Sequence, residues 1–372
     1  MDKVQSTESP LEAAGRTIGS ETTEAFKILA NETRLAILLA LWEEYETPPD
    51  DNVPFSRLLD RVDYDERGNF SYHLEKLEGP FVKQHAERGG YELQTSGLNL
   101  VRSIIAGTGI DDVSVKDAEL DESCPVCDAP TTTINYQDGV VLWTCTECDG
   151  IAPGVSMWGE LKDHMEGELG LTQFEPAGVA ERTPAELRAA SQVARHQKAR
   201  SMFNGVCPTC SGRVDGRLEY CEDHDPRGGC DNCGWLLRLL VHFECRTCED
   251  HDIVSPKRLS LFHPTVVGFY DDHGISTRIQ ADDLESARRV FDLMTDQGAE
   301  LVSEDPLRVA IIPSIDGDEV RVTIDDTASI IDVSRWDPAE DSSLLLDFGP
   351  VWLGQPEPNR RYVRILVIPS YK

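Results

Sequence analysis

Closely spaced cysteine pairs restrict the folds open to this 372-residue chain more than any other pattern in its sequence. Cys124 and Cys127 form one Cys-x-x-Cys pair, and Cys145 and Cys148 form a second pair after an interval of seventeen residues. Two such pairs joined by a hairpin bring four thiolates into the tetrahedral arrangement that zinc prefers. A thioredoxin-like redox pair is the alternative, but no βαβ pattern surrounds these cysteines. We therefore expect a small zinc ribbon over residues 123–150.

The other seven cysteines and one histidine predict a second zinc module over residues 205–255. Cys-Pro-Thr-Cys at 207–210 repeats Cys-Pro-Val-Cys at 124–127, and the later pair of each module repeats in the same way. The interval between the pairs is 34 residues in this second copy, and its added length holds a Cys-x-x-His and another Cys-x-x-Cys. We infer an outer ribbon around a nested site, with a cross-braced, RING-like arrangement as the alternative. The predicted metal ligands are Cys124, Cys127, Cys145 and Cys148 in the first site, Cys207, Cys210, Cys245 and Cys248 in the second, and Cys221, His224, Cys230 and Cys233 in the third.

Zinc sites of this kind stabilise domains that are too small to form a large core, because the free energy of metal binding becomes free energy of folding. Side chains fill all the predicted coordination positions, so the sites lack the open position that a catalytic zinc requires. We recognise no nucleophile–base pair and no phosphate-binding loop. We therefore expect about three structural Zn²⁺ ions and no enzymatic activity.

Residues 21–108 have the pattern of several short helices followed by a hairpin. Asn31 interrupts the first helical segment, and its side chain can cap the helix that follows. Gly89 and Gly90 supply the backbone freedom that a tight hairpin needs. Helices are expected over 24–40 with a break at Ala30-Asn31, from Val53 and from Arg67, then strands over 81–85 and 91–93 and a last helix from Thr95.

The helix that begins at Arg67 has the side chains of a DNA-recognition helix. Its apolar residues Phe70, Leu74 and Leu77 recur at helical spacing and are expected to face inward. The polar residues between them can then hydrogen-bond base edges and phosphates in a major groove. Including basic residues of the hairpin, the predicted DNA-contacting residues are Arg67, Asn69, Ser71, Tyr72, His73, Lys76, Lys83 and Arg88.

Three segments carry a resemblance to a known family: Leu-Ala-Asn-Glu-Thr-Arg-Leu at 29–35, Ser-Tyr-His-Leu-Glu-Lys-Leu at 71–77 and Tyr-Glu-Leu-Gln-Thr-Ser-Gly at 91–97. This region resembles the winged helix-turn-helix domain of ArsR-type transcriptional regulators. The whole chain is similar to the multi-domain, zinc-ribbon-bearing ArsR-like regulators of halophilic archaea. The resemblance implies that the recognition helix enters the major groove of double-stranded DNA and that the hairpin, or wing, touches the backbone. It also implies a homodimer, since winged helices of this type usually pair.

The net charge of −32 argues against an ordinary nucleic-acid-binding protein and against an anionic membrane as partner. The acidic residues are dispersed and only nine lysines occur against 26 arginines, which is typical of proteins from salt-loving archaea. The stretch from Arg67 to Arg88 is a local exception, with four basic residues against three acidic ones. No run of about 18 apolar residues occurs, so we expect no membrane span and a cytoplasmic protein.

The remaining segments complete an α+β, multi-domain organisation with a C-terminal α/β segment. A capping box at Thr183 predicts a helix to about Phe203, interpreted as a solvated connector. Strands are expected over 266–270, 319–324 and 362–368, and a helix over 281–297. The expected boundaries are a disordered tail (1–20), the winged helix-turn-helix (21–108), an acidic linker (109–122), the first ribbon (123–150), a connector (151–204), the second zinc module (205–255) and the C-terminal region (256–372).

These patterns predict a DNA-binding transcriptional regulator whose zinc ribbons serve stability or contacts with a partner protein. The alternative is an interaction protein whose ribbons dock onto transcription or RNA machinery without reading a DNA sequence.

Overall fold

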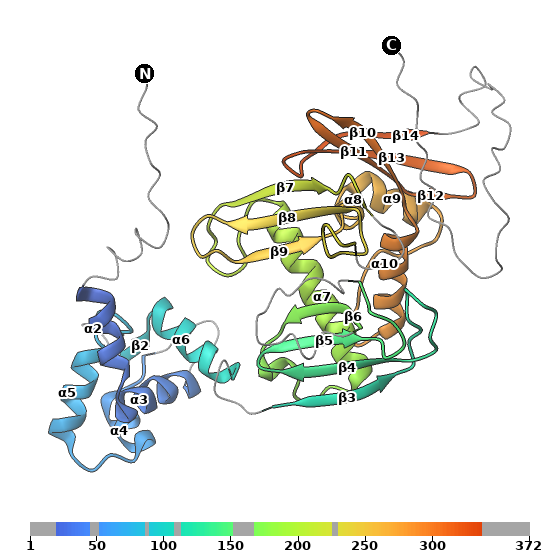
Figure 1. Cartoon of the computed structure of the whole chain (residues 1–372). Helices are drawn as coiled ribbons and strands as arrows, with labels where there is room; N and C mark the ends of the chain where they lie inside the picture. Colours follow the sequence, from blue (N-terminus) through green and yellow to red (C-terminus); the bar gives the residue numbers. More distant parts are fainter. Residues whose placement is uncertain are drawn as a thin grey trace, which may run out of the picture. The chain divides into compact units, whose positions relative to one another are not determined.

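The computed structural model describes residues 20–44, 52–85, 89–107, 113–151, 167–224 and 230–336. It is a mixed α+β structure with several small sheets (Figure 1). The chain divides into two compact units: unit 1 comprises Met1–Asp112 and Glu175–Ala177, and unit 2 comprises Val113–Phe174 and Gly178–Lys372. Within the described helices, none is long and apolar enough to cross a membrane.

Unit 1 contains short helices and a two-stranded hairpin. Its elements are α2 (Ser20–Leu29), α3 (Glu32–Glu43), α4 (Phe55–Val62), α5 (Arg67–Leu77), β1 (Val82–Gln84), β2 (Tyr91–Leu93) and α6 (Thr95–Ile105). Asn31 caps α3 as predicted, since its side chain accepts a hydrogen bond from the backbone N–H of Arg34. The core includes Leu38 of α3 and Phe70 of α5, both fully buried. The helices and the hairpin expected within residues 21–108 are therefore present in this unit.

The first sheet of unit 2 is antiparallel, in the order β3-β4-β5-β6. Its strands are β3 (Val115–Leu120), β4 (Thr132–Gln137), β5 (Val140–Thr144) and β6 (Glu168–Gln173). The prediction of an acidic linker over 109–122 is wrong from Val115 onward, where the chain forms β3. The acidic residues Asp117 and Glu119 lie on the exposed side of this strand, whereas Leu120 is buried. The high density of acidic residues in this edge strand is therefore not evidence of a linker.

The second sheet of unit 2 has the order β7-β8-β9 and is also antiparallel. Its strands are β7 (Val214–Tyr220), β8 (Leu239–Cys245) and β9 (His251–Val254), and the helix α7 (Pro184–Phe203) packs against strands of both sheets (Figure 1). Thr183 and Glu186 form the predicted capping box at the start of α7. The interpretation of this helix as a solvated connector is wrong, because the run from Leu187 to Gln192 is buried.

Beyond the first two sheets and α7, the described residues form three α-helices, a third sheet and the short 3-10 helix η2, whose first two residues belong to unit 1. The elements are η2 (Pro176–Gly178, at the unit boundary), α8 (Pro256–Ser260), α9 (Pro264–Asp272), α10 (Leu284–Asp296), β10 (Gly298–Glu304), β11 (Leu307–Ile312), β12 (Ser314–Ile315), β13 (Asp318–Asp325) and β14 (Ile330–Trp336). The predicted helix over 281–297 and strand over 319–324 are confirmed as α10 and β13. The strand expected over 266–270 is instead part of α9, which begins with Pro264 and is capped by the His263 side chain. The strand expected over 362–368 lies outside the described residues.

Candidate functional site

Twelve side chains of unit 2 come together as three groups of four candidate metal ligands. In each group the ligand atoms all lie within 4.8 Å of one another. These are the sets formed by an outer ribbon and a nested site, so the cross-braced alternative is not the arrangement in the structure. The first centre is Cys124, Cys127, Cys145 and Cys148, the second is Cys207, Cys210, Cys245 and Cys248, and the third is Cys221, His224, Cys230 and Cys233.

The spacing of the ligand atoms fits a tetrahedral ion. Metal–sulfur bonds of about 2.3 Å place the sulfurs of a tetrahedron about 3.8 Å apart. The Sγ–Sγ distances are 3.7 Å between Cys124 and Cys148, and 3.5 Å between Cys210 and Cys245. All eleven cysteines lie in the described part of the chain and are free of disulfide bonds. Four soft donors at this spacing suit Zn²⁺ among the common cellular metals.

Three of the cysteine pairs share one backbone conformation, whereas the pair at 145–148 departs from it, since Cys145 donates its N–H to the carbonyl of Gly167. The residue after the second cysteine is left-handed at Asp128 (φ 59°), Ser211 (φ 60°) and Glu249 (φ 60°). In each case the first cysteine donates its N–H to the carbonyl five residues on. These bonds join Cys124 to Ala129 (2.8 Å), Cys207 to Gly212 (2.9 Å) and Cys245 to Asp250 (2.8 Å).

Backbone N–H groups also point at the sulfurs and favour their ionised form. Val126 donates to Cys124 Sγ at 3.4 Å, and Thr247 donates to Cys245 Sγ at 3.4 Å. Hydrogen bonding, chiefly from the backbone of Cys248, lowers the pKa of Cys245 to about 6. At Cys124, burial outweighs the backbone hydrogen bonds and raises the pKa of the thiol. A Cβ atom at Gly212 would lie 3.0 Å from Cys210 Sγ, so glycine at this position leaves room for the Cys210 sulfur.

A contact of the Nε2 atom orients the imidazole ring of His224 in the third centre. Its Nε2 lies 3.1 Å from the carbonyl oxygen of Leu236, and its Nδ1 lies 3.6 Å from Cys233 Sγ. A hydrogen bond from Nε2–H to the carbonyl leaves Nδ1 free of a proton and able to bind a metal ion. His224 is therefore held in the tautomer that a ligand requires.

The centres differ in how they join the hydrophobic core. Cys124 and Cys145 belong to the cluster around the first sheet, and Cys207 and Cys245 belong to the cluster that extends from the second sheet. In the described part of the chain, none of the third centre's ligands belongs to a buried hydrophobic cluster. Loss of metal at the first two centres thus affects packing as well as coordination.

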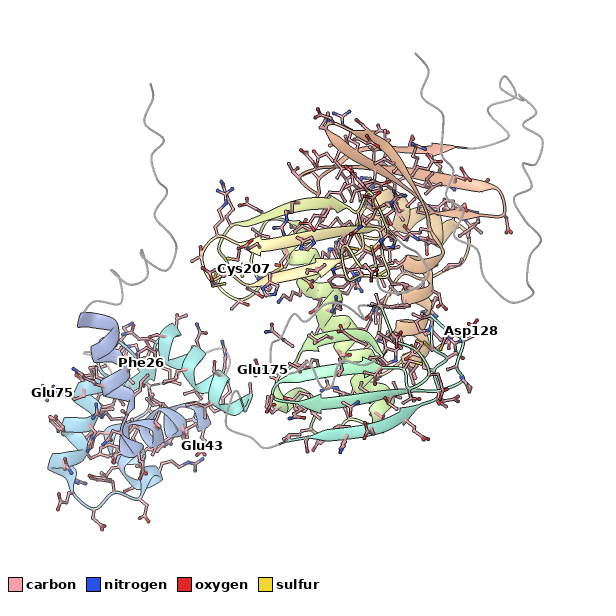
Figure 2. All side chains as sticks on the ribbon, viewed as in Figure 1. Phe26, Glu43, Glu75, Asp128, Glu175 and Cys207 are labelled. Atoms are coloured by element: carbon pink, nitrogen blue, oxygen red, sulfur yellow. The ribbon has the colours of Figure 1, made fainter. Side chains whose placement is uncertain are left out.

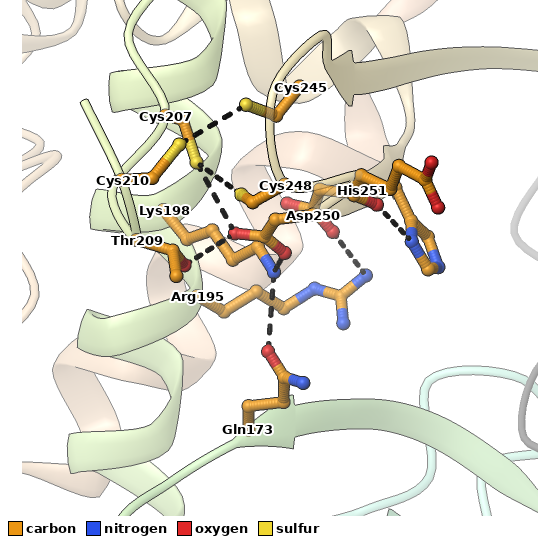
Figure 3. Close-up of polar contacts among 12 residues, drawn as sticks. Gln173, Arg195, Lys198, Cys207, Thr209, Cys210, Cys245, Cys248, Asp250 and His251 are labelled. Carbon is orange, nitrogen blue, oxygen red and sulfur yellow. Dashed lines mark hydrogen bonds and ion pairs between the residues drawn. The ribbon is translucent and has the colours of Figure 1, made fainter. Parts of the chain in front are cut away.

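A polar network beside the second centre links it to α7 (Figure 3). Asp250 lies 2.6 Å from Lys198 Nζ and accepts a hydrogen bond from Thr209 Oγ1 at 2.8 Å. Lys198 Nζ also reaches Gln173 of β6 at 3.4 Å. Sequence reasoning missed this contact of Asp250, because 52 residues separate Asp250 from Lys198 along the chain.

The outer face of α5 carries most of the predicted DNA-contacting residues. Arg67, Asn69, Ser71, Tyr72 and Lys76 are all exposed. Tyr72 is 51% exposed and lies under the ammonium group of Lys76, 5.6 Å from its ring centre. Glu75, another exposed residue of α5, is labelled in Figure 2.

The assignment of His73 to this exposed face is wrong. Its side chain is only 8% exposed, and its ring packs on Tyr64 at a centroid distance of 6.2 Å. Burial, followed by the nearby charge of Arg34, lowers the pKa of His73. His73 is three residues after Phe70 and four before Leu77, so it shares their buried side of the helix.

The hairpin supplies less positive charge than its sequence suggests. Lys83 lies 3.3 Å from Glu92, and His85 lies 2.9 Å from the same carboxylate. Burial alone would raise the pKa of Glu92, but the hydrogen bonds from His85 and Lys83 outweigh it and lower the pKa. Arg88 lies outside the described residues.

Comparison with known proteins identifies two families along the chain. Residues 121–330 match the family described as Domain of unknown function (DUF7351), and residues 22–104 match the one described as Domain of unknown function (DUF7347). The first match contains all twelve candidate ligands, and the second contains α5 and the hairpin. No curated protein and no solved structure matches the chain.

Proposed function

Because the chain belongs to the family described as Domain of unknown function (DUF7351), we propose its function from its own residues: it is a DNA-binding transcriptional regulator with structural zinc centres. Unit 1 acts as a winged helix-turn-helix of the ArsR type, with α5 in the major groove and the β1–β2 hairpin along the backbone. The observation that carries this proposal is the exposed, polar face of α5.

That face supports base recognition better than it supports general attraction to DNA. Asn69, Tyr72 and Lys76 follow one another at spacings of three and four residues, so their side chains share a ridge on the helix. Asn69 Nδ2 donates to Tyr64 Oη at 2.7 Å, which orients its amide. Since the surrounding charge is close to neutral, base contacts and DNA shape supply more of the affinity than phosphate contacts do.

Selection from a pool of randomised duplex DNA, at molar potassium chloride, tests this role. We expect the full chain to enrich one sequence motif. Replacing Asn69, Tyr72 and Lys76 together by alanine should weaken binding of that motif by more than about 100-fold, since each base contact contributes about 1–3 kcal/mol.

A matched control for this triple variant removes one charge and one amide elsewhere in unit 1. The Arg61→Ala/Asn99→Ala variant changes exposed side chains on α4 and α6 and should bind normally. An enriched motif that the triple variant still binds with full affinity would show that α5 does not read the sequence.

The three metal centres are proposed to hold structural Zn²⁺. The cysteine and histidine ligands would hold the ion, and the ion would supply positive charge that allows three or four thiolates to pack together. Native mass spectrometry of the reduced protein should therefore show three zinc ions per chain. Zinc content near zero with paired cysteines would contradict the assignment.

Contacts with a partner protein through the ribbons are a second candidate function. Val126 lies in the first cysteine pair and Leu237 lies near the third centre, and these apolar side chains are 38% and 37% exposed. If the ribbons dock on transcription or RNA machinery without DNA readout, partners recovered with the full chain should persist with the triple α5 variant.

A homodimer and a cytoplasmic location complete the proposal. Phe26 of α2 is 69% exposed and Ile105 of α6 is 48% exposed, so a second copy would cover two apolar side chains of unit 1. Free thiolate ligands are maintained in a reducing compartment such as the cytoplasm.

A further inference from the structure

A cavity of about 960 Å³ lies in unit 2 between α7, α9 and the segment 275–279 that follows α9. A cavity of this size can hold a small organic molecule. Much of its lining is apolar and comes from three different parts of the chain. These apolar residues are Val193, Leu261, Phe262, Val267, Ile275 and Ile279.

The wall formed by 275–279 is fixed at both of its ends. The N–H of Ile275 donates to the carbonyl of Tyr270 at 2.8 Å, and the carbonyl of Ser276 accepts from Arg289 Nε at 3.1 Å. Beyond the segment, the N–H of Gln280 donates to Ser286 Oγ at 2.9 Å. A wall held in this way needs little ordering when a ligand binds, which favours affinity.

The polar lining of the cavity is positively charged in a strongly acidic protein. Arg200 of α7 and Arg278 both line it, and Asp271 is the one acidic residue among its described lining residues. Within the described part of the chain, neither arginine forms an ion pair, although acidic residues outnumber basic ones by 67 to 35. Burial, together with Arg258 and Arg200, lowers the pKa of the lining residue His196 to about 4, so its ring is neutral at pH 7.

We propose that this cavity binds an organic anion, namely a carboxylate that carries a hydrophobic chain. The carboxylate would pair with Arg200 and Arg278, because guanidinium groups bind carboxylates through paired hydrogen bonds. The hydrophobic chain would pack on the apolar walls around Phe262 and Ile279, where its burial from water is favourable. This site goes beyond the proposed DNA binding and does not depend on it.

Isothermal titration of the full zinc-loaded chain with octanoate, at fixed salt and without DNA, tests the site. We expect saturable binding of one octanoate per chain, at least tenfold tighter than that of octanamide or octylammonium. Arg200→Gln and Arg278→Gln should each weaken octanoate binding by about tenfold, as expected for loss of a charge-assisted hydrogen bond. Arg308→Gln, an exposed arginine of β11 outside the cavity, should leave binding unchanged.

A second variant tests the position of the site without changing charge. A Cβ atom at the lining residue Gly268 meets nothing within 4 Å, so Gly268→Leu can fold while its side chain occupies the space beside α9. We expect it to abolish octanoate binding, whereas Thr265→Leu, on the same helix but outside the lining, should not. The proposal is wrong if no saturable binding occurs, if octanamide binds as tightly as octanoate, or if Gly268→Leu binds normally.

Discussion

Cys124→Ser is expected to unfold the first sheet of unit 2 and to remove its metal ion. Cys124 is 1% exposed and belongs to both the first centre and the hydrophobic cluster around it. Serine cannot supply a thiolate, and structural zinc contributes about 10–16 kcal/mol to the folding of small domains. This is comparable to the whole stability of a typical domain, which is about 5–15 kcal/mol.

Zinc stoichiometry and circular dichroism during heating measure this loss. Val126→Ser changes an exposed residue of the same cysteine pair that is not a ligand, and it should keep three zinc ions and the normal melting temperature. Cys221→Ser should lose one zinc ion with a smaller fall in melting temperature, because its centre lies apart from the buried clusters. A Cys124→Ser protein that melts like the unchanged protein would refute a stabilising role for the first centre.

Arg188→Met should lower the free energy of unfolding of unit 2 by about 3–5 kcal/mol, because it leaves the Glu122 carboxylate buried without its partner. Arg188 Nε and Nη2 donate to the two oxygens of Glu122 at 3.1 and 3.3 Å, and both side chains are 2% exposed. The guanidinium also lies 3.8 Å from the ring centre of Trp143. Burial raises the pKa of Glu122 even though Arg188 opposes the shift, so the charged pair is costly to bury.

Because of that cost, we expect the double variant Glu122→Leu/Arg188→Met to recover most of the stability. Urea unfolding at fixed salt provides the comparison. Arg217→Met removes an exposed ion pair with Glu219 and should change the free energy by less than about 1 kcal/mol. Equal stability of Arg188→Met and Arg217→Met would show that the buried pair contributes nothing.

The metal centres could be predicted from sequence because their chemistry is local and repeated. Each cysteine pair forms its knuckle from a few consecutive residues, and the repeat indicated which pairs belong together. The buried pair of Glu122 and Arg188 could not be predicted in this way, since 66 residues separate its members.

The wrong predictions have identifiable physical causes. His73 was placed on the exposed face although its spacing from Phe70 and Leu77 puts it on the buried side. The run 266–270 is too short for periodicity to separate a strand from a helix. Pro264, two residues before it, was the overlooked sign of a helix start.

The position of α7 has a consequence for the order in which this protein acquires its structure during synthesis. Arg195 of α7 donates to the carbonyl of Leu171 in β6 and, at 3.1 Å, to that of Ile253 in β9. Trp143 of β5 packs edge-to-face on Phe291 of α10, with ring centres 5.3 Å apart. The first ribbon therefore leaves the ribosome long before the residues that cover it, and zinc can hold its two cysteine pairs together during this interval. Final packing of unit 2 depends on contacts of high sequence separation, which form slowly.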